Sequence, residues 1–128
     1  MVILDGVTYR VRVRMPTLTR SFRIEEGERS GVVKSGDYFR DITGTYYDYA
    51  MEVEQDPAHP EEYDAFYEAI SAPEESHTIT VPYGQDTMTY EAMVSSGTDN
   101  QKDKVGGVTR WTGLSVSFKA RKPQRRPT

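Results

Sequence analysis

The hydrophobic period of this chain departs from two in only one stretch, and that stretch limits the folds that the chain can adopt. The stretch PEEYDAFYEAIS places apolar residues at the i, i+3, i+4, i+7 spacing of an amphipathic helix. These positions are Tyr63, Phe66, Tyr67 and Ile70. Pro60 suits the first turn of a helix, and Pro73 ends the pattern. We therefore predict one helix, at about residues 60–71.

Strands are predicted on both sides of this helix, because apolar and polar residues alternate there with a period of two. The predicted strands are residues 7–15, 18–24, 38–43 and 45–54 before the helix, and 77–82, 87–95 and 108–120 after it. The polar stretches 25–31 and 96–107 are predicted to be loops. Strands, one helix and then more strands indicate an α+β domain. We expect a mainly antiparallel β-sandwich or open barrel with the helix packed against it.

The whole chain is predicted to form one domain and a tail. A length of 128 residues fits a single domain with a modest core, which we assign to residues 1–120. The final segment RKPQRRPT, residues 121–128, has no apolar pattern and is predicted to be a disordered basic tail. We interpret it as a solvated end, with docking on an acidic patch of a neighbour or contact with DNA as alternatives.

Aromatic residues compensate for a hydrophobic fraction of only 36%. The strand at 45–54 has tyrosines on its inner face, since a tyrosine ring packs on a pleated surface while its hydroxyl reaches water. In the last strand, Gly113 is expected to mark a bulge that resets Trp111. The predicted core residues are Tyr47, Tyr49, Tyr63, Phe66, Tyr67, Ile70, Trp111, Leu114, Val116 and Phe118.

Charge is segregated along the chain, although the net charge is only −4. Residues 41–100 carry fourteen acids and no Lys or Arg, whereas residues 101–128 carry eight basic residues and one acid. Basic and acidic strands could pair inside one sheet, or one face of a subunit could meet the opposite face of its neighbour. The acidic block would repel a nucleic-acid duplex. The candidate assembly residues are Arg10, Arg12, Arg14, Asp48, Glu52, Glu54, Asp99, Lys102 and Lys104.

No motif in the sequence specifies catalysis, a cofactor or a metal site. The run GERSGVVKSG lacks the spacing of a phosphate-binding loop, and His59 and His77 do not match a zinc-binding pattern. There is no cysteine, no recognisable signal peptide and no apolar run long enough to cross a bilayer. We therefore expect a soluble, non-enzymatic protein that is made in the cytoplasm and uses no cofactor.

The order of several motifs resembles that of small tail proteins from siphophages and prophages of Gram-positive bacteria. A G-x-x-x-R-D-x-x-G segment comes first, followed by the helix face, a V-x-Y strand and a W-x-G-L-S-V-x-F strand. The matching residues are Gly36, Arg40, Asp41 and Gly44, then Tyr63 to Ile70, then Val81 and Tyr83, then Trp111 to Phe118. The resemblance covers nearly the whole chain.

This resemblance implies the tail-tube and distal-tail fold, a β-sandwich or barrel with one helix that assembles into rings, commonly of six subunits. It implies a mechanical role in the virion tail after synthesis in the host bacterial cytoplasm. The implied partners are further copies of the protein and other tail proteins. The alternative is a small β-barrel binding module for a sugar or another small ligand, a function that the excess of Tyr and Trp would suit.

Overall fold

Two long antiparallel strands organise the fold. In the computed structural model, which describes residues 1–127, β7 (Ile42–Glu54) and β11 (Val108–Ala120) pair along part of their lengths. The paired stretch joins residues 49–53 of β7 to residues 114–118 of β11. Beyond this stretch the two strands continue in opposite directions, and each then pairs with a different partner.

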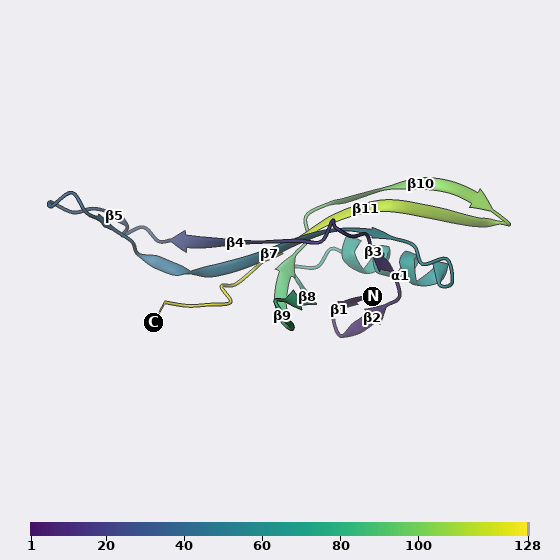
Figure 1. Ribbon diagram of the computed structural model, residues 1–128, viewed down its shortest axis with the longest axis horizontal. Helices are drawn as coiled ribbons and strands as arrows, with labels where there is room; N and C mark the ends of the chain where they lie inside the picture. The colour runs from purple at the N-terminus through teal and green to yellow at the C-terminus, as the bar shows by residue number, and fades with distance from the viewer. Residues whose placement is uncertain (128) are drawn as a thin grey trace.

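These continuations form two hairpins that project from opposite ends of the body (Figure 1). The first part of β7 pairs with β4 (Thr19–Glu26), and the short strands β5 (Gly31–Val32) and β6 (Tyr38–Phe39) lie beyond them. We call residues 19–48 the arm. The first part of β11 pairs with β10 (Gly97–Val105), and we call this pair the β10–β11 hairpin.

The body between the two hairpins completes the sheet. Its strands are β1 (Val2–Leu4), β2 (Val7–Tyr9), β3 (Arg12–Val13), β8 (His77–Tyr83) and β9 (Asp86–Met93). The strand order is β2-β1-β8-β9-β11-β7-β3, and all pairings are antiparallel. This curled sheet with one packed helix confirms the predicted α+β class. No helix in the described chain is long and apolar enough to span a membrane.

The helix α1 (Pro60–Ser71) has the predicted bounds. Its buried side chains are Tyr63, Phe66 and Ile70, and the Phe66 ring meets the ring of Tyr9 edge-on at 5.5 Å. The prediction for Tyr67 was wrong, because 39% of this residue is exposed. The sheet is open and does not wrap around the helix, so only the central line of the apolar stripe is covered.

The core follows the predicted inner faces of the long strands. Of the other predicted core residues, Tyr47 and Trp111 are half-buried and pack against the cluster. Buried residues in the cluster include Tyr49, Leu114, Val116 and Phe118 from the prediction, together with Leu4, Val11, Val53, Ile79 and Val81. The Tyr49 hydroxyl donates to the backbone oxygen of Pro82 at 2.6 Å, which provides its polar end with a partner.

The predicted loop at 96–107 is wrong, because most of it forms β10. This strand is polar on both faces and therefore lacks the alternation that identifies a strand. Gly106 and Gly107 close the hairpin with φ values of 59° and 79°, as a type I′ turn requires. The expected irregularity at Gly113 is present: φ is 70°, and the register shifts between Thr98 and Asn100 opposite it.

Strand boundaries in the first half also differ from the prediction. The predicted strand 7–15 is divided into β2 and β3, and Val7 and Met15 are exposed. The predicted break at Gly44 is absent, since β7 runs through this residue. Because Gly44 has no side chain, it can take an extended shape that another segment of backbone approaches closely.

That approaching segment is the C-terminal tail. The prediction of a disordered tail was therefore wrong for residues 121–127. Thr128 lies outside the described residues. Thr45 donates its N–H to the backbone oxygen of Arg125 at 2.8 Å and accepts from the N–H of Gln124 at 2.9 Å. The Gln124 side chain accepts from the Tyr47 N–H at 3.0 Å. The tail therefore lies along the edge of β7 that faces away from β4.

Candidate assembly surface

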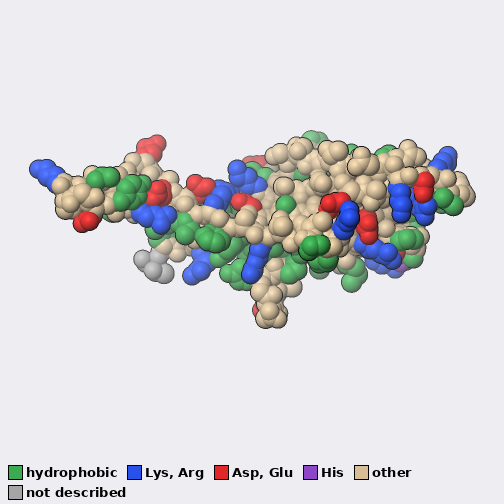
Figure 2. Space-filling model, turned by 45° about the horizontal axis from the view of Figure 1, so that its top comes forward, with side chains coloured by type: hydrophobic (Ala, Val, Ile, Leu, Met, Phe, Trp, Pro, Cys, Tyr) green, Lys and Arg blue, Asp and Glu red, His purple; other side chains and the backbone are tan. Residues whose placement is uncertain are grey.

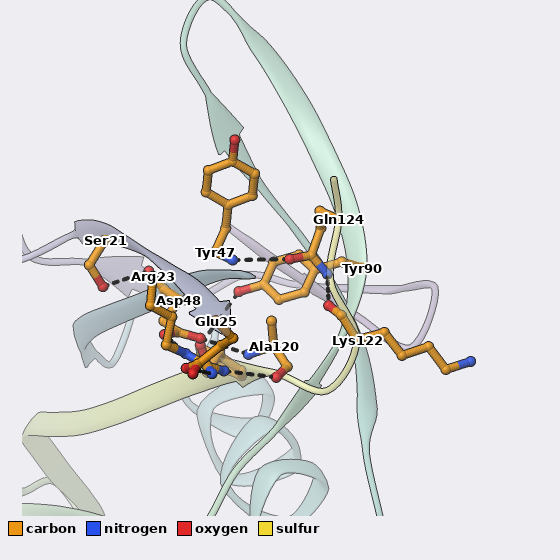
Figure 3. Close-up of polar contacts among 10 residues, drawn as sticks. Ser21, Arg23, Glu25, Tyr47, Asp48, Tyr90, Ala120, Lys122 and Gln124 are labelled. Atoms are coloured by element: carbon orange, nitrogen blue, oxygen red, sulfur yellow. Dashed lines mark hydrogen bonds and ion pairs between the residues drawn. The ribbon is translucent and has the colours of Figure 1, made fainter. Parts of the chain in front are cut away.

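The root of the arm is fixed by a cluster of charged and backbone groups (Figure 3). Arg23 donates through Nε to Asp48 at 2.9 Å, and through its terminal nitrogens to Glu25 at 2.7 Å and to the backbone oxygen of Ala120 at 3.3 Å. Asp48 also accepts the Ala120 N–H at 2.8 Å. The guanidinium lies 4.5 Å from the centre of the Tyr46 ring.

These contacts tie three strands together where the arm leaves the body. The hydrogen bond to Asp48 raises the pKa of Arg23 above its ordinary value, so the Arg23 guanidinium keeps its positive charge. Asp48 was predicted to face a neighbouring subunit, but its carboxylate is fully engaged within its own chain. The direction of the arm is therefore set by the fold.

Beyond this root the arm exposes a run of apolar side chains. They are Phe22, Ile24, Val32, Val33, Tyr38, Phe39 and Ile42, and we call them the arm patch. Figure 2 shows hydrophobic and charged side chains side by side along this narrow projection. Phe22 and Val32 are each 68% exposed. The arm is only about two strands wide, so it has no interior in which these side chains could be buried.

The far end of the arm, residues 27–42, nevertheless has defined internal contacts. The Gly27 N–H donates to the Asp41 backbone oxygen at 2.7 Å, and the Asp41 N–H donates to the Ser30 hydroxyl at 2.6 Å. Glu26 accepts from the Tyr38 hydroxyl at 3.0 Å and from Arg40 at 2.8 Å. The apolar residues are thus presented on a folded hairpin.

The predicted charged residues pair mainly within the chain. Arg10 meets Glu62 at 2.6 Å, and Arg14 meets Glu52 at 3.3 Å. Arg12 lies opposite Glu54 in register, but its guanidinium is directed to Asp56 at 3.6 Å. The β3–β7 pairing and the Arg14–Glu52 contact support the interpretation that basic and acidic segments pair inside one sheet, whereas Glu62 lies on α1 and Asp56 follows β7.

Other predicted charged residues lie on the β10–β11 hairpin. Lys102 and Lys104 are exposed on β10, with no carboxylate within ion-pair distance in residues 1–127. The predicted set therefore does not form one surface. The sequence-based predictions missed the arm patch, although the motif VVKSGDYF, in which two apolar pairs flank a turn, indicates a hairpin.

A groove lies between α1 and the β10–β11 hairpin. It encloses about 360 Å³ and is lined by Tyr63, Asp64, Tyr67, Glu68, Asp99 and Trp111. The buried Tyr63 donates its hydroxyl to Asp99 at 2.7 Å. Burial and this hydrogen bond raise the pKa of Tyr63 strongly, so the hydroxyl keeps its proton and remains a donor to Asp99.

Two histidine environments have structural explanations. His59, Glu61 and Glu62 converge closely enough to suggest a metal site. However, the Arg10 guanidinium already contacts Glu62 at 2.6 Å and lies 3.3 Å from His59, so a cation occupies this position. His77 is buried and pairs with Asp5 at 2.7 Å.

Comparisons with protein-family models, with curated proteins and with solved structures found no match for this chain.

Proposed function

We propose that this protein is a non-enzymatic structural subunit of a phage or prophage tail that works by assembling with copies of itself and with other tail proteins. The observation that carries the proposal is the arm patch, an exposed apolar surface on a projection whose root is fixed. The motif order that resembles siphophage tail proteins supplies the biological setting, including a place in the virion tail.

The arm patch is energetically suited to association. Burying one exposed Val, Ile or Phe side chain contributes about 1.5–3 kcal/mol. A neighbour that covered several of the seven residues would offset part of the entropy that association costs. Several exposed apolar side chains gathered on one projection are a common mark of protein–protein contact.

The shape of the subunit suits a ring. The arm and the β10–β11 hairpin project in opposite directions and differ in chemistry (Figure 1). The arm exposes apolar side chains beside charged ones, whereas β10 carries polar side chains on both faces. Contact between unlike surfaces is heterologous, and a heterologous contact generates a ring when the rotation closes. Six subunits per ring is the number that the resemblance implies.

The second candidate is a binding module for a sugar or another small ligand. It is favoured by the groove beside α1, where Tyr67 and Trp111 could stack on a sugar face while Asp64 and Asp99 accept its hydroxyl groups. Against it, Tyr63, Tyr49 and Tyr90 are buried and contribute to packing.

Electron microscopy of the concentrated protein tests the tail-subunit proposal. We expect closed rings or stacks of rings in the wild-type sample. The variant Phe22→Ser/Phe39→Ser, which alters two exposed residues, should give single subunits only. Featureless single particles in both samples at every concentration would contradict the proposal.

A further inference from the structure

We propose that the groove beside α1 receives the end of the arm from a second copy of this chain. The inference rests on the proposed self-assembly and goes further, because it names the receiving surface. It follows from the charge of the groove, the chemistry of the arm end and the positions of the two along the molecule.

The groove carries negative charge and aromatic surface together. Asp64, Glu68 and Asp99 line it, and none of them has a Lys or Arg within ion-pair distance in the described part of the chain. The rings of Tyr67 and Trp111 lie in the same groove. A cation attached to an apolar stem suits such a surface, since it meets carboxylates and ring faces at once.

The hollow surface also continues past Tyr67 along the helix. A second hollow of about 280 Å³ shares Tyr67, and its lining mixes apolar residues such as Ile70 and Val94 with polar ones that include Glu74. An occupant of both hollows would therefore need a basic group next to apolar side chains.

The end of the arm offers that combination. Val32 and Val33 are 68% and 50% exposed, and Lys34 follows directly. Lys34 has no carboxylate within ion-pair distance in residues 1–127. The Arg29 side chain is 84% exposed, and in the described residues its guanidinium has one ion-pair contact, at 3.7 Å to Asp41. The arm end thus carries available cations beside exposed apolar residues.

One molecule cannot satisfy its own groove with its own arm. The arm end and α1 lie far apart along the long axis, and the contacts at Arg23 and Asp48 hold the arm away from the helix (Figure 1). An arm from a second copy has no such restriction. The contact is heterologous, as ring assembly requires.

Cross-linking tests this pairing directly, because the chain has no cysteine of its own. The full-length variants Val33→Cys and Glu68→Cys are mixed under mild oxidation, and the disulfide-linked heterodimer is quantified. The matched control is Thr8→Cys, an exposed residue of β2 outside the groove. We expect at least fivefold more heterodimer with Glu68→Cys than with Thr8→Cys. Equal yields would overturn the inference.

A charge exchange provides the second test. Lys34→Glu and Glu68→Lys should each weaken self-association about fivefold or more, and the double variant should recover most of the loss. Lys119→Glu, on an exposed residue of β11, is the control and should change little. Losses that add in the double variant would contradict the pairing of arm end and groove.

The outcomes separate this inference from the proposed function. If Phe22→Ser/Phe39→Ser abolishes self-association but Glu68→Cys cross-links no better than Thr8→Cys, assembly through the arm stands and the groove assignment falls. If the wild-type chain stays a monomer and no pair cross-links, both fall.

Trp111 is the sole tryptophan. A sugar that shifts its emission and leaves cross-linking unchanged would assign the groove to a small ligand and overturn the inference.

Discussion

At the scale of single residues, Gly44 shows how a missing side chain allows two segments to meet. A Cβ at this position would lie 2.6 Å from the backbone oxygen of Arg125 and 2.6 Å from the Cβ of Pro123. Neither group can move without displacing the tail, because Arg125 also accepts the Thr45 N–H. The tail is therefore held on β7 by a contact that only glycine permits.

Gly44→Ala should detach the tail from β7 and leave the body folded. We expect the Thr45 and Tyr47 amides to exchange with solvent about tenfold faster, because their acceptors lie on the tail. Gly31→Ala is the matched control, since a Cβ there meets nothing within 4 Å. Unchanged exchange at Thr45 in Gly44→Ala, measured by hydrogen exchange, would refute the described position of the tail.

Asp5 is a second residue with a specific role. It occupies a left-handed conformation with φ of 52° in the two-residue turn between β1 and β2. Its carboxylate accepts from the Thr78 N–H at 2.8 Å and lies 2.7 Å from His77 Nδ1. Desolvation opposes the charged form, but the hydrogen bonds with His77 and Thr78 outweigh it and lower the pKa of Asp5 below 3.8.

A lowered carboxyl pKa stabilises the fold above the unfolded-state pKa, and this contribution is lost as pH falls through the folded-state pKa. Asp5→Asn keeps a side chain that tolerates the left-handed turn. It should lower the free energy of unfolding at pH 7 by less than about 1 kcal/mol, because the site is half exposed. Urea unfolding should give a smaller difference near pH 3 than at pH 7. A larger difference at pH 3 than at pH 7 would contradict this role.

At the scale of elements, the helix owes its stability to one line of contacts. Phe66→Ala should lower the free energy of unfolding by about 3–5 kcal/mol, because Phe66 is fully buried. Tyr67→Ala on the next residue should cost less than about 1 kcal/mol under monomeric conditions. Equal losses in a urea titration of the two variants would contradict the assignment of Tyr67 to the surface.

The arm root is a second element-scale device. Arg23→Met should destabilise the arm by roughly 1–3 kcal/mol, because the partly buried Asp48 loses its charged donor. Faster amide exchange in β4 and in the arm portion of β7 would report this change. Arg29→Met removes an exposed arginine of the same arm and should leave the exchange unchanged. Equal effects of the two variants would show that the contacts of Arg23 do not hold the arm.

Sequence alone predicts the elements whose residues repeat a clear period, such as the helix at 60–71 and the β8–β9 hairpin. The strand β10 escapes prediction because its polar residues carry no period, and only the Gly106–Gly107 turn indicates it. The alternation around Phe22 indicates a strand, but it does not reveal whether another element covers that face. Exposure of the arm patch depends on the absence of such a cover, which is a tertiary property. In the same way, the helical spacing places Tyr67 on the apolar stripe but does not reveal whether another element covers it.

At the scale of the whole molecule, the chain has one core and two unlike projections. The body covers one face of α1 and the paired stretches of β7 and β11, whereas the first parts of these two strands extend beyond the core. Charge is largely neutralised within each chain by pairs such as Arg10–Glu62 and Arg110–Asp103. Association is therefore expected to depend mainly on apolar contact by the arm, with a smaller contribution from the cations at its end.

The solution mass of the purified protein, followed across a concentration series at low and at high salt, tests this account most directly. The wild-type mass should rise above 14.6 kDa with concentration and should persist in part at high salt. Phe22→Ser/Phe39→Ser should remain at the monomer mass with an unchanged circular dichroism spectrum. A wild-type monomer at every concentration and salt, or a variant that associates as strongly as the wild type, would contradict assembly through the arm.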